Sequence, residues 1–191
     1  MYIIDKNAEN EIIIKKSRFI TKLYYIEDVN KVNDIINELK KEYKKCTHIC
    51  YSYIIGLNAK AVDDGEPSGT AGKPILNVLQ KKDMTNVLCV VIRYFGGIKL
   101  GAGGLVRAYT KSVTEALKST EFIELEIGYK ARISFQYSQE KQINYILNNS
   151  KVLNKEFLEN VVYTVLINDK VLEKLNNYDL EILEKLYIEK V

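Results

Sequence analysis

Residues 93–109, RYFGGIKLGAGGLVRAY, combine five of the ten glycines of the chain with two arginines, one lysine and two tyrosines. Glycines that open a helix leave backbone N–H groups free at its positive end, which favours anions. Arginine binds phosphate through paired hydrogen bonds, and rings such as those of Tyr94, Phe95 and Tyr109 stack on nucleobases. The sequence therefore predicts a site for phosphate or RNA made of Arg93, Tyr94, Gly96, Gly97, Lys99, Gly101, Gly103, Gly104, Arg107 and Tyr109, with His48 and Lys73.

A structural interpretation of the same glycines stands beside this one. Glycine permits positive φ and close packing of a strand against a helix, with no ligand involved. The arginines would then neutralise the acidic loop DDGEPSG, which contains Asp63, Asp64 and Glu66. The two interpretations are compatible, because ion pairs can hold two loops together while the backbone amides face solvent.

The acidic loop also allows a magnesium site, since carboxylate oxygens are ligands that Mg²⁺ prefers. Adjacent carboxylates in a loop more often act as helix caps and ion-pair partners. We therefore expect no cofactor and no metal, and keep magnesium held by Asp63, Asp64 and Glu66 as the alternative.

Other catalytic motifs fail on their spacing. GTAGKP is not a phosphate-binding P-loop, because Pro67 stands at the first glycine position and Pro74 follows Lys73. Cys46, His48 and Cys50 would share one face of a strand, but alternate strand positions lie about 6–7 Å apart, too far for one metal ion. His48 is the only histidine and no nucleophile pairs with it in the sequence. No catalytic residues are predicted.

The pattern along the chain predicts a mixture of helices and strands. The run NVLCVVIRYF, residues 86–95, is almost continuously apolar, which is typical of a strand buried on both faces. Apolar residues at helical spacing predict helices at about 29–45, 75–83 and 102–119, with strands at 11–26 and 47–57 and a loop at 58–74. The strand at 11–26 is expected to break near Lys16.

Two domains are expected in 191 residues. Strands at 121–128 and 129–137, a helix at 138–150, two strands in 151–168, a helix at 169–179 and a last strand or helix at 180–189 complete the chain. From residue 129 the order β-α-β-β-α-β is the split pattern of a ferredoxin-like domain. We therefore predict an α+β protein with domains at 1–127 and 128–191.

Composition limits the environment of the protein. Residues 128–191 hold nine basic and nine acidic residues, so the net charge of +3 belongs to residues 1–127. No apolar run is long enough for a membrane span, and the N-terminus lacks the features of a signal peptide. The three cysteines form no disulfide framework. We expect a cytoplasmic protein with reduced thiols and no membrane partner.

The segments DDGEPSGTAGKPIL and NVLCVVIRYFGGIKLGAGGLVRAY, with KKSRFI and CTHICYSY before them, resemble the signature of the YigZ/IMPACT family over residues 15–118. The resemblance implies a first domain like the second domain of a ribosomal small-subunit protein and domain IV of elongation factor G. It implies a second, ferredoxin-like domain similar to domain V of that factor. Eukaryotic relatives regulate translation by interfering with activation of a stress kinase on ribosomes.

We do not carry the kinase role over, because the sequence leaves no room for the N-terminal partner-binding domain of the eukaryotic relatives. The leading hypothesis is a non-enzymatic protein associated with RNA or the ribosome, with protein partners in translation as a further expectation. The alternatives are a metal-assisted enzyme acting on a phosphorylated small molecule, with His48 as acid or base, and a protein-interaction module. In the last case Arg93 and Arg107 should both be paired with carboxylates.

Overall fold

A computed structural model describes residues 1–190 of the protein. The chain forms two compact units, which divide between Ile123 and Glu124. The division falls within one continuous strand, β7 (Phe122–Phe135). The sequence predicted two strands here because Gly128 looked like a break, but Gly128 pairs with Asn168 on one side and Leu186 on the other.

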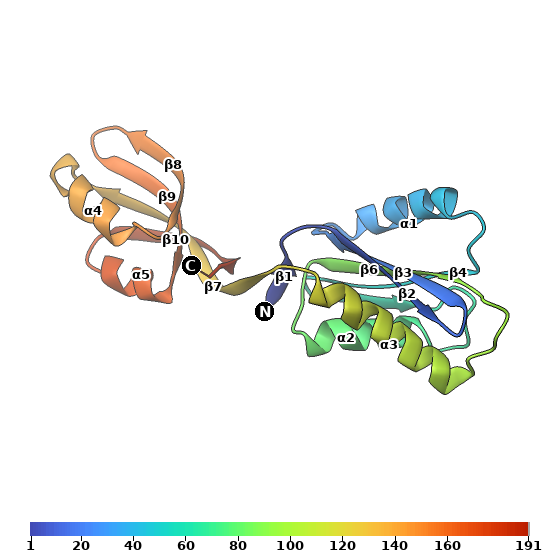
Figure 1. Ribbon diagram of the computed structural model, residues 1–191. Helices are drawn as coiled ribbons and strands as arrows, with labels where there is room; N and C mark the ends of the chain where they lie inside the picture. The colour runs from blue at the N-terminus through green and yellow to red at the C-terminus, as the bar shows by residue number, and fades with distance from the viewer. Residues whose placement is uncertain (191) are drawn as a thin grey trace. The chain divides into compact units, whose positions relative to one another are not determined.

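The first unit is a five-stranded sheet with helices on both faces (Figure 1). A short strand, β1 (Tyr2–Ile4), precedes it and bridges to Met84. The sheet order is β2-β3-β6-β4-β5, with every neighbouring pair antiparallel. The strands are β2 (Ala8–Ile14), β3 (Ser17–Tyr25), β4 (His48–Ile55), β5 (Asn58–Val62) and β6 (Val87–Tyr94), and the helices are α1 (Asn30–Glu42), α2 (Gly72–Lys81) and α3 (Ala102–Lys118).

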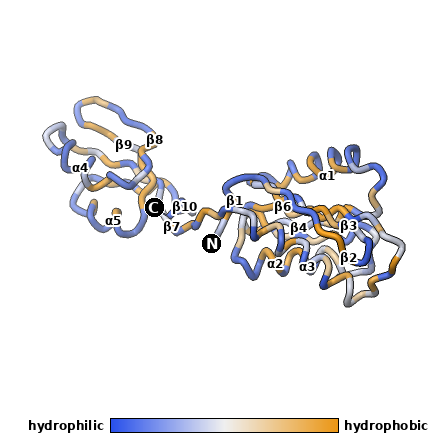
Figure 2. The backbone as a smooth tube through the Cα atoms, viewed as in Figure 1, coloured by the Kyte–Doolittle hydropathy of each residue, from blue (hydrophilic) through white to orange (hydrophobic). Residues whose placement is uncertain are grey.

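Strand β6 separates two hydrophobic cores. Val87, Cys89 and Val91 pack with α2 and α3 on one face of the sheet, while alternate residues of β6 pack with α1 on the other face. Figure 2 shows the hydrophobic colour along the strands that lie between the helices. The strand buried on both faces that the apolar run at 86–95 predicted is confirmed, because helices cover both faces of β6.

Strand β5 lies in the segment that the sequence predicted as a loop. Gly56 adopts a φ of 55° in a two-residue turn, after which Asn58 pairs with Ile55. The segment NAKAV has little β-branched or aromatic content and is mostly exposed. Its strand conformation follows from the hairpin turn and from pairing with β4, both of which depend on the neighbouring strand.

In the second unit β10, β7, β9 and β8 are neighbours in this order, all antiparallel, and β1 also pairs with β7. The elements of this unit follow the predicted β-α-β-β-α-β order, and the final segment is a strand. They are η1 (Tyr137–Gln139), α4 (Glu140–Ile146), β8 (Lys151–Phe157), β9 (Val161–Asn168), α5 (Asp169–Leu175) and β10 (Asp179–Glu189). The core places Tyr163, Val165 and Ile167 of β9 against Ile143 of α4 and Leu175 of α5.

The mixed α+β class predicted from the sequence is confirmed. None of the helices within residues 1–190 is both long enough and apolar enough to cross a membrane.

Candidate functional site

Three strand ends meet at one end of the first sheet. Strands β3 and β4 both run antiparallel to β6, with Arg18 opposite Tyr94 and His48 opposite Arg93. The β2–β3 turn, the α1–β4 connection and the glycine loop after β6 therefore lie at the same end. Backbone N–H groups of the glycine loop bind the other two segments: Phe95 donates to Thr47 Oγ1 at 2.9 Å and Gly96 donates to Ser17 Oγ at 3.2 Å.

Glycine is required at two positions of the loop for different structural reasons. A Cβ atom at Gly96 would lie 2.0 Å from the carbonyl carbon of Lys16, so only glycine lets the loop approach the β2–β3 turn this closely. Gly101 precedes α3 with a φ of 71°, a conformation that other residues adopt with strain. The structural interpretation of the glycines therefore applies to these two positions.

Arg93 lies in the interior, beneath α3. It extends the face of β6 that carries Cys89 and Val91, and the residue is 5% exposed. Its Nη1 donates to Glu66 Oε1 at 2.5 Å and its Nη2 to Ser17 Oγ at 3.4 Å. The Tyr109 hydroxyl donates to the same Glu66 oxygen at 2.8 Å, so two donors converge on one buried carboxylate.

This arrangement places Arg93 and Tyr109 differently from the surface positions predicted for them. Strand alternation turns position 93 toward α3, and Tyr109 belongs to the apolar stripe of α3 with Leu105 and Val113. Neither side chain reaches a ligand at the surface. Burial raises the pKa of the Tyr109 hydroxyl, which therefore remains protonated and able to donate to Glu66.

His48 is at the rim of the same cluster. Its Nδ1 lies 2.8 Å from the carbonyl oxygen of Asp64, and a carbonyl only accepts, so Nδ1 carries a proton. The other ring nitrogen, Nε2, lies 3.9 Å from Glu66 Oε2. The ring is thus oriented by the acidic loop and faces Glu66, with a side chain 19% exposed.

The carboxylates of the acidic loop are bonded to the chain itself and face different partners. Asp63 accepts from the backbone N–H groups of Gly69, Ala71 and Gly72 at 2.8–3.0 Å, at the start of α2. Asp64 Oδ2 accepts from the N–H of Ile49 at 2.6 Å. Within residues 1–190, no three His, Cys, Asp or Glu side chains are grouped as metal ligands.

The Asp63 carboxylate holds the acidic loop against the start of α2 by accepting these backbone hydrogen bonds. Burial would raise its pKa, but the N–H groups of Gly69, Gly72 and Ala71 outweigh burial and hold the pKa of Asp63 below its usual value. A carboxylate with a lowered pKa stabilises the fold above its usual pKa, and this contribution disappears as the pH falls through the lowered value.

Asp63→Ala should therefore lower the free energy of unfolding at pH 7 by about 1–2 kcal/mol, the usual cost of losing a helix cap. The difference from the unmodified protein should shrink as the pH falls below the ordinary aspartate pKa of about 4, because the unfolded chain then takes up a proton that folded Asp63 still resists. Urea unfolding between pH 7 and pH 3 measures both effects. Asp34→Ala removes an exposed carboxylate of α1 and should leave the pH dependence unchanged. A pH-independent difference for Asp63→Ala would contradict the account.

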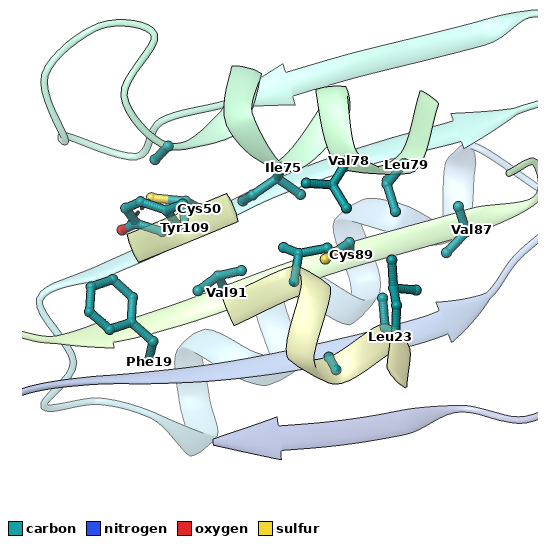
Figure 3. Close-up of a cluster of buried hydrophobic side chains, with 14 of the residues drawn as sticks. Phe19, Leu23, Cys50, Ile75, Val78, Leu79, Val87, Cys89, Val91 and Tyr109 are labelled. Atoms are coloured by element: carbon teal, nitrogen blue, oxygen red, sulfur yellow. Dashed lines mark hydrogen bonds between the residues drawn. The ribbon is translucent and has the colours of Figure 1, made fainter. Parts of the chain in front are cut away.

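The two cysteines of CTHIC, Cys46 and Cys50, have different surroundings. Cys50 is buried beside Tyr109, as Figure 3 shows, and its thiol donates to the carbonyl oxygen of Asp63 at 2.9 Å. Burial raises the pKa of the Cys50 thiol to about 12, so it does not act as a thiolate. Cys46 lies two positions before His48 and is partly exposed.

The start of α3 is the part of the predicted site that faces solvent. The helix has no acidic residue in its first turn, and no side chain caps it. Arg107 is exposed, and a Cβ at Gly103 would lie 3.6 Å from its Nη1, so the guanidinium covers the first turn. Gly97, Gly101 and Lys99 are exposed in the loop before it, and Gly104 is half-buried.

The sequence prediction thus combined two groups of residues that the structure separates. The side chains of Arg93 and Tyr109 face inward, and the His48 side chain is mostly buried. Tyr94 is half-buried, and the Arg18 guanidinium lies 5.4 Å from its ring centre. Lys73 is exposed on α2. Ser17 and Thr47, whose hydroxyls hold the glycine loop, were not predicted from the sequence, where their signal is a position at the start of a strand.

The fold and this site define a two-unit α+β protein with a glycine loop and cations at one end of its first unit. A family model described as the Impact N-terminal domain matches residues 15–117, more than half of the chain. The chain belongs to the IMPACT family.

Relatives cover both units. The Bacillus subtilis protein described as IMPACT family member YvyE is 42% identical over 174 residues, which are 88% of this chain and 80% of that protein. The Escherichia coli protein described as IMPACT family member YigZ is 34% identical over 151 residues, 75% of this chain and 74% of that protein. A crystal structure described as that of a hypothetical protein matches with a TM-score of 0.65 at 29% identity, covering 100% of this chain and 98% of the other.

Proposed function

We propose that the first unit binds RNA through the end of the sheet where the glycine loop lies, in a role connected with translation. The observation that carries the proposal is that exposed cations from four segments lie at the end of the sheet where α3 starts without a side-chain cap. They are Lys15 and Lys16 of the β2–β3 turn, Lys44 and Lys45 of the α1–β4 connection, Lys99 of the glycine loop and Arg107 of α3.

None of these six cations has an ion-pair partner within the described part of the chain, residues 1–190. The nearby carboxylates of Asp63, Asp64 and Glu66 accept hydrogen bonds from other parts of the chain and form no ion pair with these six cations. The cations therefore keep their charge available for a partner. Cations spread over four segments suit a polyanion with several phosphates better than a single phosphate group.

The choice of RNA rests on this charge arrangement together with the family resemblance. The resemblance implies domains like domains IV and V of elongation factor G, a factor that acts on ribosomes, and eukaryotic relatives that regulate translation. A structured fragment of ribosomal RNA is therefore the appropriate first probe.

The protein-interaction alternative expected Arg93 and Arg107 both to be paired with carboxylates. Arg93 is paired with Glu66, whereas Arg107 is exposed without an ion-pair partner within residues 1–190. The buried pair connects the end of β6 to the acidic loop, and the exposed arginine supports a binding role for the outer surface.

Lys99→Ala combined with Arg107→Ala should weaken binding of the RNA fragment roughly tenfold at low salt. Each lost phosphate contact removes about one released counterion, so the slope of log affinity against log salt should become less negative by about 2. Filter-binding titrations between about 50 and 200 mM salt measure both quantities.

The matched control is Lys81→Ala combined with Lys82→Ala. It removes the same charge from exposed residues at the C-terminal end of α2, near the start of β6 rather than its end. This variant should bind like the unmodified protein. Equal losses in the two double variants would show only a general effect of net charge, and an unchanged Lys99/Arg107 variant would contradict the proposal.

A further inference from the structure

Three side chains form a ladder that runs from the core to the surface beside the glycine loop. The Arg93 guanidinium carbon lies 5.5 Å from the ring centre of Phe19 and 5.6 Å from the ring centre of Phe95. Phe19 is fully buried, Arg93 is 5% exposed and Phe95 is 45% exposed. The guanidinium is thus placed between a core ring and a surface ring.

Both inner members of the ladder are fixed. Phe19 packs edge-on against Tyr109, with ring centres 5.3 Å apart, and Arg93 is held by Glu66 and Ser17. Arg93 Nε is buried with no hydrogen-bond partner, so the guanidinium position is determined by its other nitrogens and by the two rings. The backbone of Phe95 is itself held at its N–H by Thr47.

The exposed ring of Phe95 is surrounded by features of a nucleic-acid surface. Lys99 is exposed in the same loop, and Lys44 and Lys45 precede the Thr47 that binds the Phe95 backbone. Ile98, four positions before Ala102 of α3, adds exposed apolar surface (41% exposed). The exposed ring of Phe95 leaves apolar surface in contact with water unless a partner covers it. Every nucleobase has a flat face that an aromatic ring can stack on.

We infer that Phe95 is a stacking platform for an unpaired nucleobase, and that the partner of this surface is single-stranded RNA or a single-stranded segment of a folded RNA. This inference rests on the proposed function and specifies its ligand. A nucleobase on the outer face of Phe95 would extend the Phe19–Arg93–Phe95 ladder by one ring. A duplex keeps its base faces stacked on one another, so it would meet only the cations.

The test compares three probes on the full-length protein: a 12-nucleotide single-stranded oligoadenylate, an RNA duplex of the same length and inorganic polyphosphate. Phe95→Ala should weaken binding of the single strand roughly tenfold and leave binding of the duplex and polyphosphate unchanged, because only base stacking is removed. Phe157→Ala removes a more exposed phenylalanine of the second unit, 56% exposed, and should have no effect.

A fluorescence measurement gives an independent readout. The chain contains no tryptophan, so Phe95→Trp introduces a single reporter at the platform. Oligoadenylate should quench its emission and polyphosphate should not, whereas a Phe157→Trp reporter should respond to neither. Phe95→Trp should also retain the affinity for the single strand that Phe95→Ala loses.

The outcomes separate this inference from the proposed function. If Phe95→Ala binds the single strand as the unmodified protein does while the Lys99/Arg107 variant is weakened, the stacking platform is overturned and RNA binding stands. An equal loss for the single strand and the duplex also overturns the platform. If the unmodified protein binds neither RNA probe, both proposals fail.

Discussion

Glu66→Leu is expected to lower the free energy of unfolding by about 3–5 kcal/mol, the cost of breaking a buried ion pair by removing one partner. Glu66 accepts from Arg93 and from Tyr109 through one carboxylate oxygen, and the side chains of Glu66 and Arg93 are 3% and 6% exposed. Without the carboxylate, the Arg93 charge remains buried and uncompensated. Urea unfolding followed by far-UV circular dichroism measures the loss.

A double-mutant cycle distinguishes a specific pair from general disruption of the core. Arg93→Met should be destabilising because it leaves the Glu66 charge buried. The double variant Arg93→Met with Glu66→Leu contains no buried charge, and its loss should be smaller than the sum of the two single losses by more than 1 kcal/mol. Additive losses would contradict a coupled pair at this position.

The exposed pair of Arg18 and Glu11 provides the matched control. Arg18 Nε donates to Glu11 Oε1 at 2.7 Å and its Nη2 to Oε2 at 2.9 Å, so this pair is also directly hydrogen-bonded, but both side chains are more than one third exposed. Water solvates either charge when the other is removed, so Glu11→Leu should change stability little. The contrast isolates burial as the reason for the large effect of Glu66→Leu.

The sequence predicted the orientation of some residues better than their function. The apolar spacing along the 102–119 helix predicts that Tyr109 faces the core, whereas its ring suggests a place in the binding site, and these two roles conflict. The periodicity was the better guide, because it records which side of α3 faces the sheet, and Tyr109 is fully buried there. For Arg93, the same alternation along β6 places it on the face of Val91, but the sequence alone does not show which helix covers that face.

The convergence of cations at the end of the sheet was beyond sequence analysis. Lys16, Lys45 and Lys99 are separated by tens of residues, and only the strand order β3-β6-β4 and its register bring their segments together. For this reason the sequence alone predicts only a solvated basic helix end at Lys44 and Lys45. A glycine loop before a helix was visible in the sequence, but the hydroxyls of Ser17 and Thr47 that hold it depend on non-local strand pairing.

The same non-local packing makes Gly96 a position where substitution should strongly reduce stability. Gly96→Ala should lower the free energy of unfolding by about 3 kcal/mol, at the upper end of the usual cost of overpacking. The new Cβ would lie 2.0 Å from the Lys16 carbonyl carbon, 2.1 Å from its oxygen and 2.4 Å from the Ser17 nitrogen. All three atoms belong to backbone, so relief requires the glycine loop to move away from the β2–β3 turn. Urea unfolding gives the loss, and RNA titration tests whether the displaced loop also binds more weakly.

Gly103→Ala is the control in the same loop–helix segment, and its effect should have the opposite sign. Gly103 lies in the first turn of α3, where a Cβ would meet only Arg107 Nη1 at 3.6 Å, an ordinary contact. Alanine restricts the unfolded chain and favours the helix, so Gly103→Ala should raise stability by about 0.5 kcal/mol. If the two variants changed stability in the same direction, the close approach of Gly96 to Lys16 would not be what requires glycine in this loop.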